Sequence, residues 1–175
     1  MDSARADKNQ VTQTSPPSLG RASLIANVLI VDDDPQAAGL MLRTLAQKGI
    51  RGIIADSAEA AIDSLDKVDY DLVFTSDRIC QRPGLAPKPQ NAFDLLHRIK
   101  QNSPEMPVIM MADSCRQDAP DHQQIAEAAV KAVRAGCCDF LVKPLDPQKL
   151  WGILDTLLPN HTVQKLGGLT VYRAT

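Results

Sequence analysis

Polar side chains follow three short apolar runs in this sequence. Three consecutive carboxylates come after the first run, a serine and an aspartate after the second, and a lysine after the third (Asp32–Asp34, Ser76-Asp77 and Lys143). Adjacent carboxylates repel one another, and a bound divalent cation relieves that repulsion; oxygen ligands of this kind suit Mg²⁺. An aspartate beside such a cation can accept a phosphoryl group, and a lysine can neutralise phosphoryl oxygens. The pattern therefore favours metal-assisted phosphoryl chemistry if the three runs end at one place.

Each of these residues also has an ordinary structural interpretation. Asp34 precedes Pro35 and could cap a helix while Asp32 and Asp33 stay solvated. A single lysine after a strand, such as Lys143, usually lies on the protein surface. Convergence of the three runs on one edge of a sheet would favour a functional site over these readings.

Five apolar runs alternate with amphipathic segments and predict a sheet covered by helices. The runs are Val28–Val31, Ile53–Ala55, Leu72–Phe74, Val108–Met111 and Phe140–Val142. Strands that are apolar throughout are buried on both faces, as in a parallel sheet. The segments between them have helical periodicity, and capping patterns mark their starts at Asp34-Pro35, Asp56 with Glu59, Asp121 with Gln124, and Asp146-Pro147. Right-handed crossovers then predict a doubly wound α/β fold, which binds ligands at the carboxyl ends of its strands.

Composition narrows the class of protein. The 175 residues include 19 Lys and Arg against 21 Asp and Glu, so the formal net charge is −2 and a general nucleic-acid binder is disfavoured. No apolar run reaches the roughly 18 residues that span a bilayer, and residues 1–20 contain no apolar stretch typical of a signal peptide. We therefore expect a cytoplasmic protein that contacts neither membrane nor nucleic acid directly.

We expect a disordered arm over 1–26, one folded domain over 27–158 and a tail over 159–175, where Leu169–Tyr172 could form a short strand.

The motifs VLIVDDDP, YDLVFTSD, PVIMM and AGCCDFLVKPLD resemble the receiver domains of two-component response regulators. The resemblance covers residues 27–158 and implies the flavodoxin-like fold with strand order 2-1-3-4-5. Members of this family take a phosphoryl group from a phosphohistidine onto an aspartate and require Mg²⁺. The resemblance implies a histidine kinase or phosphotransfer protein as donor and no enzyme activity beyond self-catalysed phosphoryl transfer and dephosphorylation. Output to an unknown protein, or a homodimer, would use the face formed by residues 125–133, 140–142 and 150–158.

The same resemblance assigns roles to individual residues. Asp32 and Asp33 match the metal-binding acids, and Lys143 matches the lysine that contacts the phosphoryl group. Pro144 matches the usual cis-proline of the family. Phe140 matches an aromatic residue that changes orientation on activation, although a phenylalanine on a strand is more often plain core.

Two functional positions depart from the family pattern. Ser76 stands in the ungapped position of the acceptor aspartate, and Asp77 comes one residue later. Strand side chains alternate between faces, so Asp77 can serve as acceptor only if a bulge or an early strand end restores its aim. Ser76 is a poor nucleophile because no base accompanies it. The hydroxyl residue that follows the fourth run in the family is Ala112 here, and Ser114 could replace it only through a rearranged loop.

Three functions follow from these observations. The first is a phosphorylation-competent receiver with Asp77 as acceptor, Lys143 on the phosphoryl oxygens and Mg²⁺ held by Asp32, Asp33 and Asp77. The second is a degenerate pseudo-receiver, a phosphorylation-independent module for protein interactions. The third is a small hydrolase on the same sheet, for which the sequence offers no positioned base. The long segments 78–90 and 113–123 leave the same sheet edge and could cover the site or dock a partner.

Overall fold

The computed structural model describes residues 25–114, 121–158, 164–166 and 169–171. Most of the expected arm and tail therefore lies outside the described residues, as do residues 115–120 of the second long segment. Ala26, the last residue of the expected arm, is fully buried. Among the described helices, none is long and apolar enough to cross a membrane.

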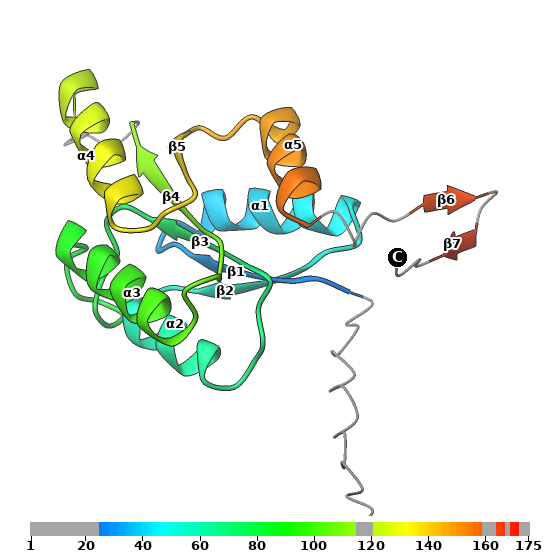
Figure 1. Cartoon of the computed structure of the whole chain (residues 1–175), viewed down its shortest axis with the longest axis horizontal. Helices are drawn as coiled ribbons and strands as arrows, with labels where there is room; N and C mark the ends of the chain where they lie inside the picture. The colour runs from blue at the N-terminus through cyan, green and yellow to red at the C-terminus, as the bar shows by residue number, and fades with distance from the viewer. Residues whose placement is uncertain (1–24, 115–120, 159–163, 167–168, 172–175) are drawn as a thin grey trace, which may run out of the picture.

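Five parallel strands form the central sheet, in the order β2-β1-β3-β4-β5 (Figure 1). Their bounds are β1 Asn27–Val31, β2 Arg51–Ala55, β3 Leu72–Ser76, β4 Val108–Asp113 and β5 Asp139–Lys143. Each contains one of the five apolar runs, so the predicted strands and the predicted order are both confirmed. A separate antiparallel pair consists of β6 Gln164–Leu166 and β7 Leu169–Val171.

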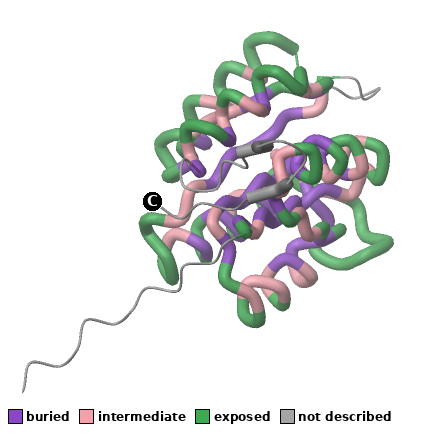
Figure 2. Tube along the Cα trace, turned by 90° about the vertical axis from the view of Figure 1, so that its right-hand side faces the viewer, coloured by how far each residue is buried: buried purple, intermediate pink, exposed green. Residues whose placement is uncertain are grey.

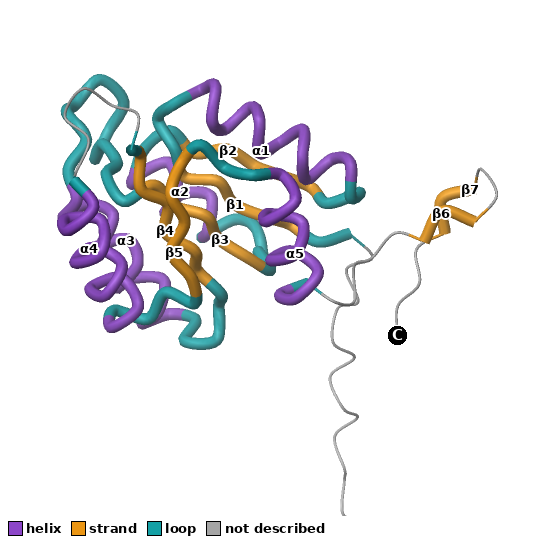
Figure 3. Tube along the Cα trace, turned by 90° about the horizontal axis from the view of Figure 1, so that it is seen from above, coloured by secondary structure: helices purple, strands orange, loops and turns teal. Residues whose placement is uncertain are grey.

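Five helices connect the strands and cover the sheet on both faces (Figure 3). Their bounds are α1 Pro35–Gln47, α2 Ala58–Leu65, α3 Pro89–Asn102, α4 His122–Arg134 and α5 Pro147–Leu157. Two apolar clusters result: one face of the sheet packs on α1 and α5, and the other packs on α2, α3 and α4. Figure 2 shows the buried chain running through the centre and the exposed residues along the outer sides of the helices.

Most of the predicted helix starts are confirmed, and one is wrong. Asp34 and Asp146 cap α1 and α5 with their side chains, and Asp121 forms the expected capping box with Gln124 at the start of α4. At α2 the cap is Ser57, whose hydroxyl accepts from the backbone N–H of Ala60. That helix starts one residue later than the sequence pattern suggested.

Candidate functional site

Three polar residues from three strands lie on one side of the sheet at its carboxyl edge. In β3, Leu72 and Phe74 pack in the cluster beside α1 and α5, and Ser76 continues the same phase. Alternation places Asp32 and Lys143 on that side too, because they follow the inward-facing residues of β1 and β5 in the same way. All three are buried, with exposed fractions of 2% for Asp32, 0% for Ser76 and 5% for Lys143. The expected convergence on one edge is therefore present.

A buried ion pair joins the first and last of these strands. The Lys143 ammonium donates a hydrogen bond to Oδ2 of Asp32. The other oxygen, Oδ1, accepts from the backbone N–H of Asp34 at 3.1 Å. Burial raises the pKa of the Asp32 carboxyl, and the charge of Lys143 opposes that rise. Both oxygens of this carboxylate are thus engaged by groups of the protein itself.

Ser76, and not Asp77, is the neighbour of Asp32 in the sheet. Val31 pairs with Thr75, so the residues that follow each of them lie side by side. The β3–β4 register runs without interruption to Ser76, and the backbone N–H of Asp77 donates to the carbonyl of Met111 at 2.7 Å. The strand ends at Ser76, and the chain bends at Asp77, whose side chain is half-buried. The β3–β4 pairing contains no bulge, so the carboxylate of Asp77 can face the site only through the bend that follows the strand.

The Ser76 hydroxyl is a buried polar group without compensation. Its oxygen has no hydrogen-bond partner among the described residues. Such a group costs free energy in the folded state, which makes this position unusual in an otherwise well-packed strand.

The expected metal-binding trio is not assembled, and this is a correction to the prediction from sequence. Burial raises the pKa of the Cys80 thiol, and the nearby carboxylates of Asp33 and Asp56 add to the rise. Asp32 is occupied by Lys143, and Asp77 lies beyond the end of β3. Within the described part of the chain, no three His, Cys, Asp or Glu side chains converge on a point that could hold a metal ion. These residues do not fit a Mg²⁺ site in this arrangement.

The remaining family positions have clear locations. Ala112 is fully buried on β4, and the Ser114 hydroxyl donates to the backbone carbonyl of Lys143 at 2.6 Å, so it stabilises the end of β5. Phe140 is half-buried against the cluster beside α2, α3 and α4. The Lys143–Pro144 peptide is cis, as the resemblance implied.

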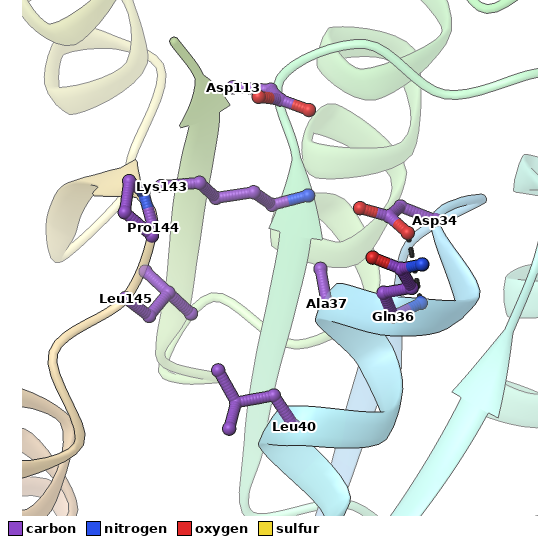
Figure 4. A pocket seen from close by; sticks show the side chains of 8 residues that line it. All are labelled: Asp34, Gln36, Ala37, Leu40, Asp113, Lys143, Pro144 and Leu145. Atoms are coloured by element: carbon purple, nitrogen blue, oxygen red, sulfur yellow. Dashed lines mark hydrogen bonds between the residues drawn. The ribbon is translucent and has the colours of Figure 1, made fainter. Parts of the chain in front are cut away.

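A cavity of about 380 Å³ opens between the start of α1 and the segment after β5 (Figure 4). Its lining residues are Asp34, Gln36, Ala37, Leu40, Asp113, Lys143, Pro144 and Leu145. In Figure 4 the Lys143 side chain reaches from the end of β5 toward Asp34 at the start of α1, with Asp113 above it in this view. Asp113, which pairs with Lys143 in the β4–β5 register, was missed by the sequence argument. The signal was there, because Asp113 continues the phase of Ile109 and Met111.

The long segment after β3 is tied to α2 and does not line this cavity. The backbones of Ile79 and Lys88 pair in both directions and close the segment into a loop. The carbonyls of Cys80 and Gln81 accept from the first N–H groups of α2, and Arg82 forms an ion pair with Glu59 at 2.7 Å. The segment therefore packs on the start of α2, and its role in covering the site or docking a partner stays a prediction.

With the fold and site described, comparison with known proteins identifies the family. The family model for the response regulator receiver domain matches residues 28–155. The chain belongs to this family. The receiver is 31% identical over 143 residues to the DNA-binding transcriptional regulator NtrC of Rhizobium meliloti and 32% identical over 148 residues to the nitrogen assimilation regulatory protein NtrX of Azorhizobium caulinodans. These matches cover 81% and 82% of the chain but only 26% and 29% of the relatives, so the receiver spans less than a third of either regulator.

Solved structures place the receiver in the same fold. NtrX from Brucella abortus, crystallised with ADP, superposes with a TM-score of 0.63 at 27% identity, over 78% of this chain and 28% of that one. A response regulator from Chloroflexus aurantiacus gives a TM-score of 0.61 at 24% identity, over 77% of this chain and 98% of that one, and supports the fold alone. The receiver fold predicted from the sequence is thus confirmed.

Proposed function

We propose that this chain is the receiver module of a response regulator that takes its input from a histidine kinase or phosphotransfer protein and gives its output through protein contacts. The observation that carries the proposal is the buried Lys143–Asp32 pair at the carboxyl edge of a receiver sheet, beside an open cavity. Ligands of doubly wound sheets bind at this edge.

Exposed apolar side chains favour an output surface on α4 and β5. Val130 and Val133 on α4 and Val142 on β5 are 51%, 55% and 41% exposed. Such side chains on neighbouring elements suit a contact with an output protein or with a second copy of the chain.

The phosphoryl acceptor that we propose is Asp77. Its carboxylate directly follows β3 and is half-exposed, so a phosphodonor can reach it from solvent. In the transfer, a carboxylate oxygen attacks phosphorus while the bond to the donor nitrogen breaks. Lys143 would have to leave Asp32 to neutralise the transferred group. Receiver domains generally use Mg²⁺ for this reaction, whereas the acids at this edge do not fit the ion in the arrangement described. Apart from such self-catalysed chemistry, we propose no turnover of a substrate.

A second candidate is the phosphorylation-independent interaction module. One specific observation favours it: Ser76, which lacks a carboxylate, occupies the buried position beside Asp32. A neutral hydroxyl there leaves Lys143 paired with Asp32 and the site without an acceptor.

Intact mass after incubation with acetyl phosphate and MgCl₂ separates the two candidates. The first expects a gain of one phosphoryl group that is lost in Asp77→Asn and kept in the matched control Asp63→Asn, which changes an exposed carboxylate on α2. Absence of any gain, from acetyl phosphate and from a phosphorylated histidine phosphotransfer protein alike, would favour the second candidate. A gain that persists in Asp77→Asn would refute Asp77 as the acceptor.

A further inference from the structure

The acidic edge of this receiver already contains a cation. The Lys143 ammonium contacts Oδ2 of Asp32, and the two side chains are 5% and 0% exposed. The ion pair is therefore shielded from solvent on both sides, unlike the surface pair of Arg82 and Glu59, whose side chains are 68% and 43% exposed. A shielded pair of this kind is not weakened by competing water, and separating it leaves a buried charge without a partner.

Direct contact between the ammonium and Asp32 competes with a divalent cation for the same oxygen. Mg²⁺ requires a near-octahedral shell of oxygen ligands at about 2.1 Å and loses its water reluctantly. It would also lie against the positive charge of Lys143 as long as the ammonium stays on Asp32. The second oxygen of Asp32 is held by the N–H of Asp34.

The neighbouring residue removes the negative charge that would attract a second cation. Ser76 stands beside Asp32 in the register and contributes a neutral hydroxyl. Strand β3 therefore contributes a hydroxyl, and not a second carboxylate, beside the pair of Asp32 and Lys143. The charge of Asp33 acts on the thiol of Cys80, and no three His, Cys, Asp or Glu side chains of the described residues form a group that could hold a metal ion. Burial and geometry thus agree that Asp32 is already engaged by Lys143.

We propose that Lys143 is the resident cation of this site and that the receiver maintains its acidic edge without Mg²⁺. The inference uses the proposed function only in taking this edge as the signalling site, and it holds whether or not Asp77 accepts a phosphoryl group. Ser76 stands where the family has an acceptor carboxylate, and Lys143 pairs with Asp32. Together the two features leave the edge without the oxygen ligands that Mg²⁺ would need.

Thermal unfolding of the full chain with and without millimolar MgCl₂, at matched ionic strength, tests the proposal. We expect no change in Tm for the wild type or for Lys149→Gln, which changes an exposed lysine on α5. Ser76→Asp adds a carboxylate beside Asp32, and Lys143→Gln removes the internal cation. Both variants should acquire a Tm increase of about 4 °C at a Mg²⁺ concentration about tenfold above Kd. Calorimetric titration with MgCl₂ provides a direct measure of binding.

Three results would overturn the proposal. A Mg²⁺-dependent Tm increase in the wild type that Asp32→Asn abolishes would show that the metal displaces Lys143. If MgCl₂ changes the Tm of neither the wild type nor the Ser76→Asp and Lys143→Gln variants, then Lys143 is not what excludes the metal. If Lys143→Gln does not fold, a Ser76→Asp variant whose Tm is unchanged by MgCl₂ refutes the proposal by itself. Phosphorylation is read by mass in a separate experiment, so failure of one conclusion is distinguishable from failure of the other.

Discussion

Breaking the Lys143–Asp32 pair should cost far more stability than breaking a surface pair. In Asp32→Asn the ammonium of Lys143, 5% exposed, keeps its burial and loses its counterion. Removing one partner of a buried pair typically costs about 3–5 kcal/mol, whereas an exposed pair contributes at most about 1 kcal/mol. Since domains of this size unfold with roughly 5–15 kcal/mol, Asp32→Asn should lose a large part of its stability.

A double-mutant cycle isolates the pair from other effects of the substitutions. Asp32→Asn, Lys143→Met and the double variant would be compared by urea unfolding monitored by circular dichroism. The double variant contains no buried charge at this position, so it should be more stable than Asp32→Asn alone, with a coupling energy of about 2–3 kcal/mol. Glu59→Gln, at the exposed pair with Arg82, is the control and should change stability little. Additive effects, or a loss below about 1 kcal/mol in Asp32→Asn, would refute a shielded ion pair.

Three further predictions concern packing, the orphan hydroxyl and a buried thiol. In Gly52→Ala the new Cβ would lie 2.4 Å from Cδ2 of Leu42, so we expect the free energy of unfolding to fall by about 1–2 kcal/mol. In Gly152→Ala the new Cβ has no neighbour within 4 Å, so the free energy of unfolding should rise by up to about 1 kcal/mol. Thermal unfolding of both variants checks these values. Ser76→Ala should be neutral or up to about 1 kcal/mol more stable in urea, because its oxygen has no partner, and a clear loss would contradict that description. Burial raises the pKa of Cys137 from 9.0 to about 12, so iodoacetamide should label it much faster in urea than in the native protein near pH 8. Because the folded thiol holds its proton longer than the unfolded one, stability should fall as pH rises from 9.0 toward 12, and a flat profile would contradict the shift.

The fold was predictable because its signals are local. Each strand contains a continuous apolar run, and residues such as Asp34 and Asp146 mark helix starts within a few positions. The exception at α2 is also local: Ser57 and Asp56 are both good caps, and the choice depends on where the loop after β3 meets the helix.

The site was predictable only in part because its contacts cross the sheet. Alternation correctly favoured Ser76 over Asp77 as the neighbour of Asp32. The partner of Lys143 could not be deduced, since a long flexible side chain on β5 can reach several residues at the same edge. Attachment of the segment 78–90 to α2 depends on which helix N–H groups its carbonyls meet, which no sequence pattern encodes.

Lys143, at the end of an edge strand, connects the proposed output surface on β5 to the buried carboxylate of Asp32. Its backbone belongs to β5, beside the exposed Val142, while its ammonium is anchored at β1, three strands away in the sheet order. A partner protein that binds along β5 and shifts the last residues of this strand would therefore move Lys143 relative to Asp32. We expect binding of a partner at β5 to alter the contact between Asp32 and Lys143 without any covalent change at Asp32.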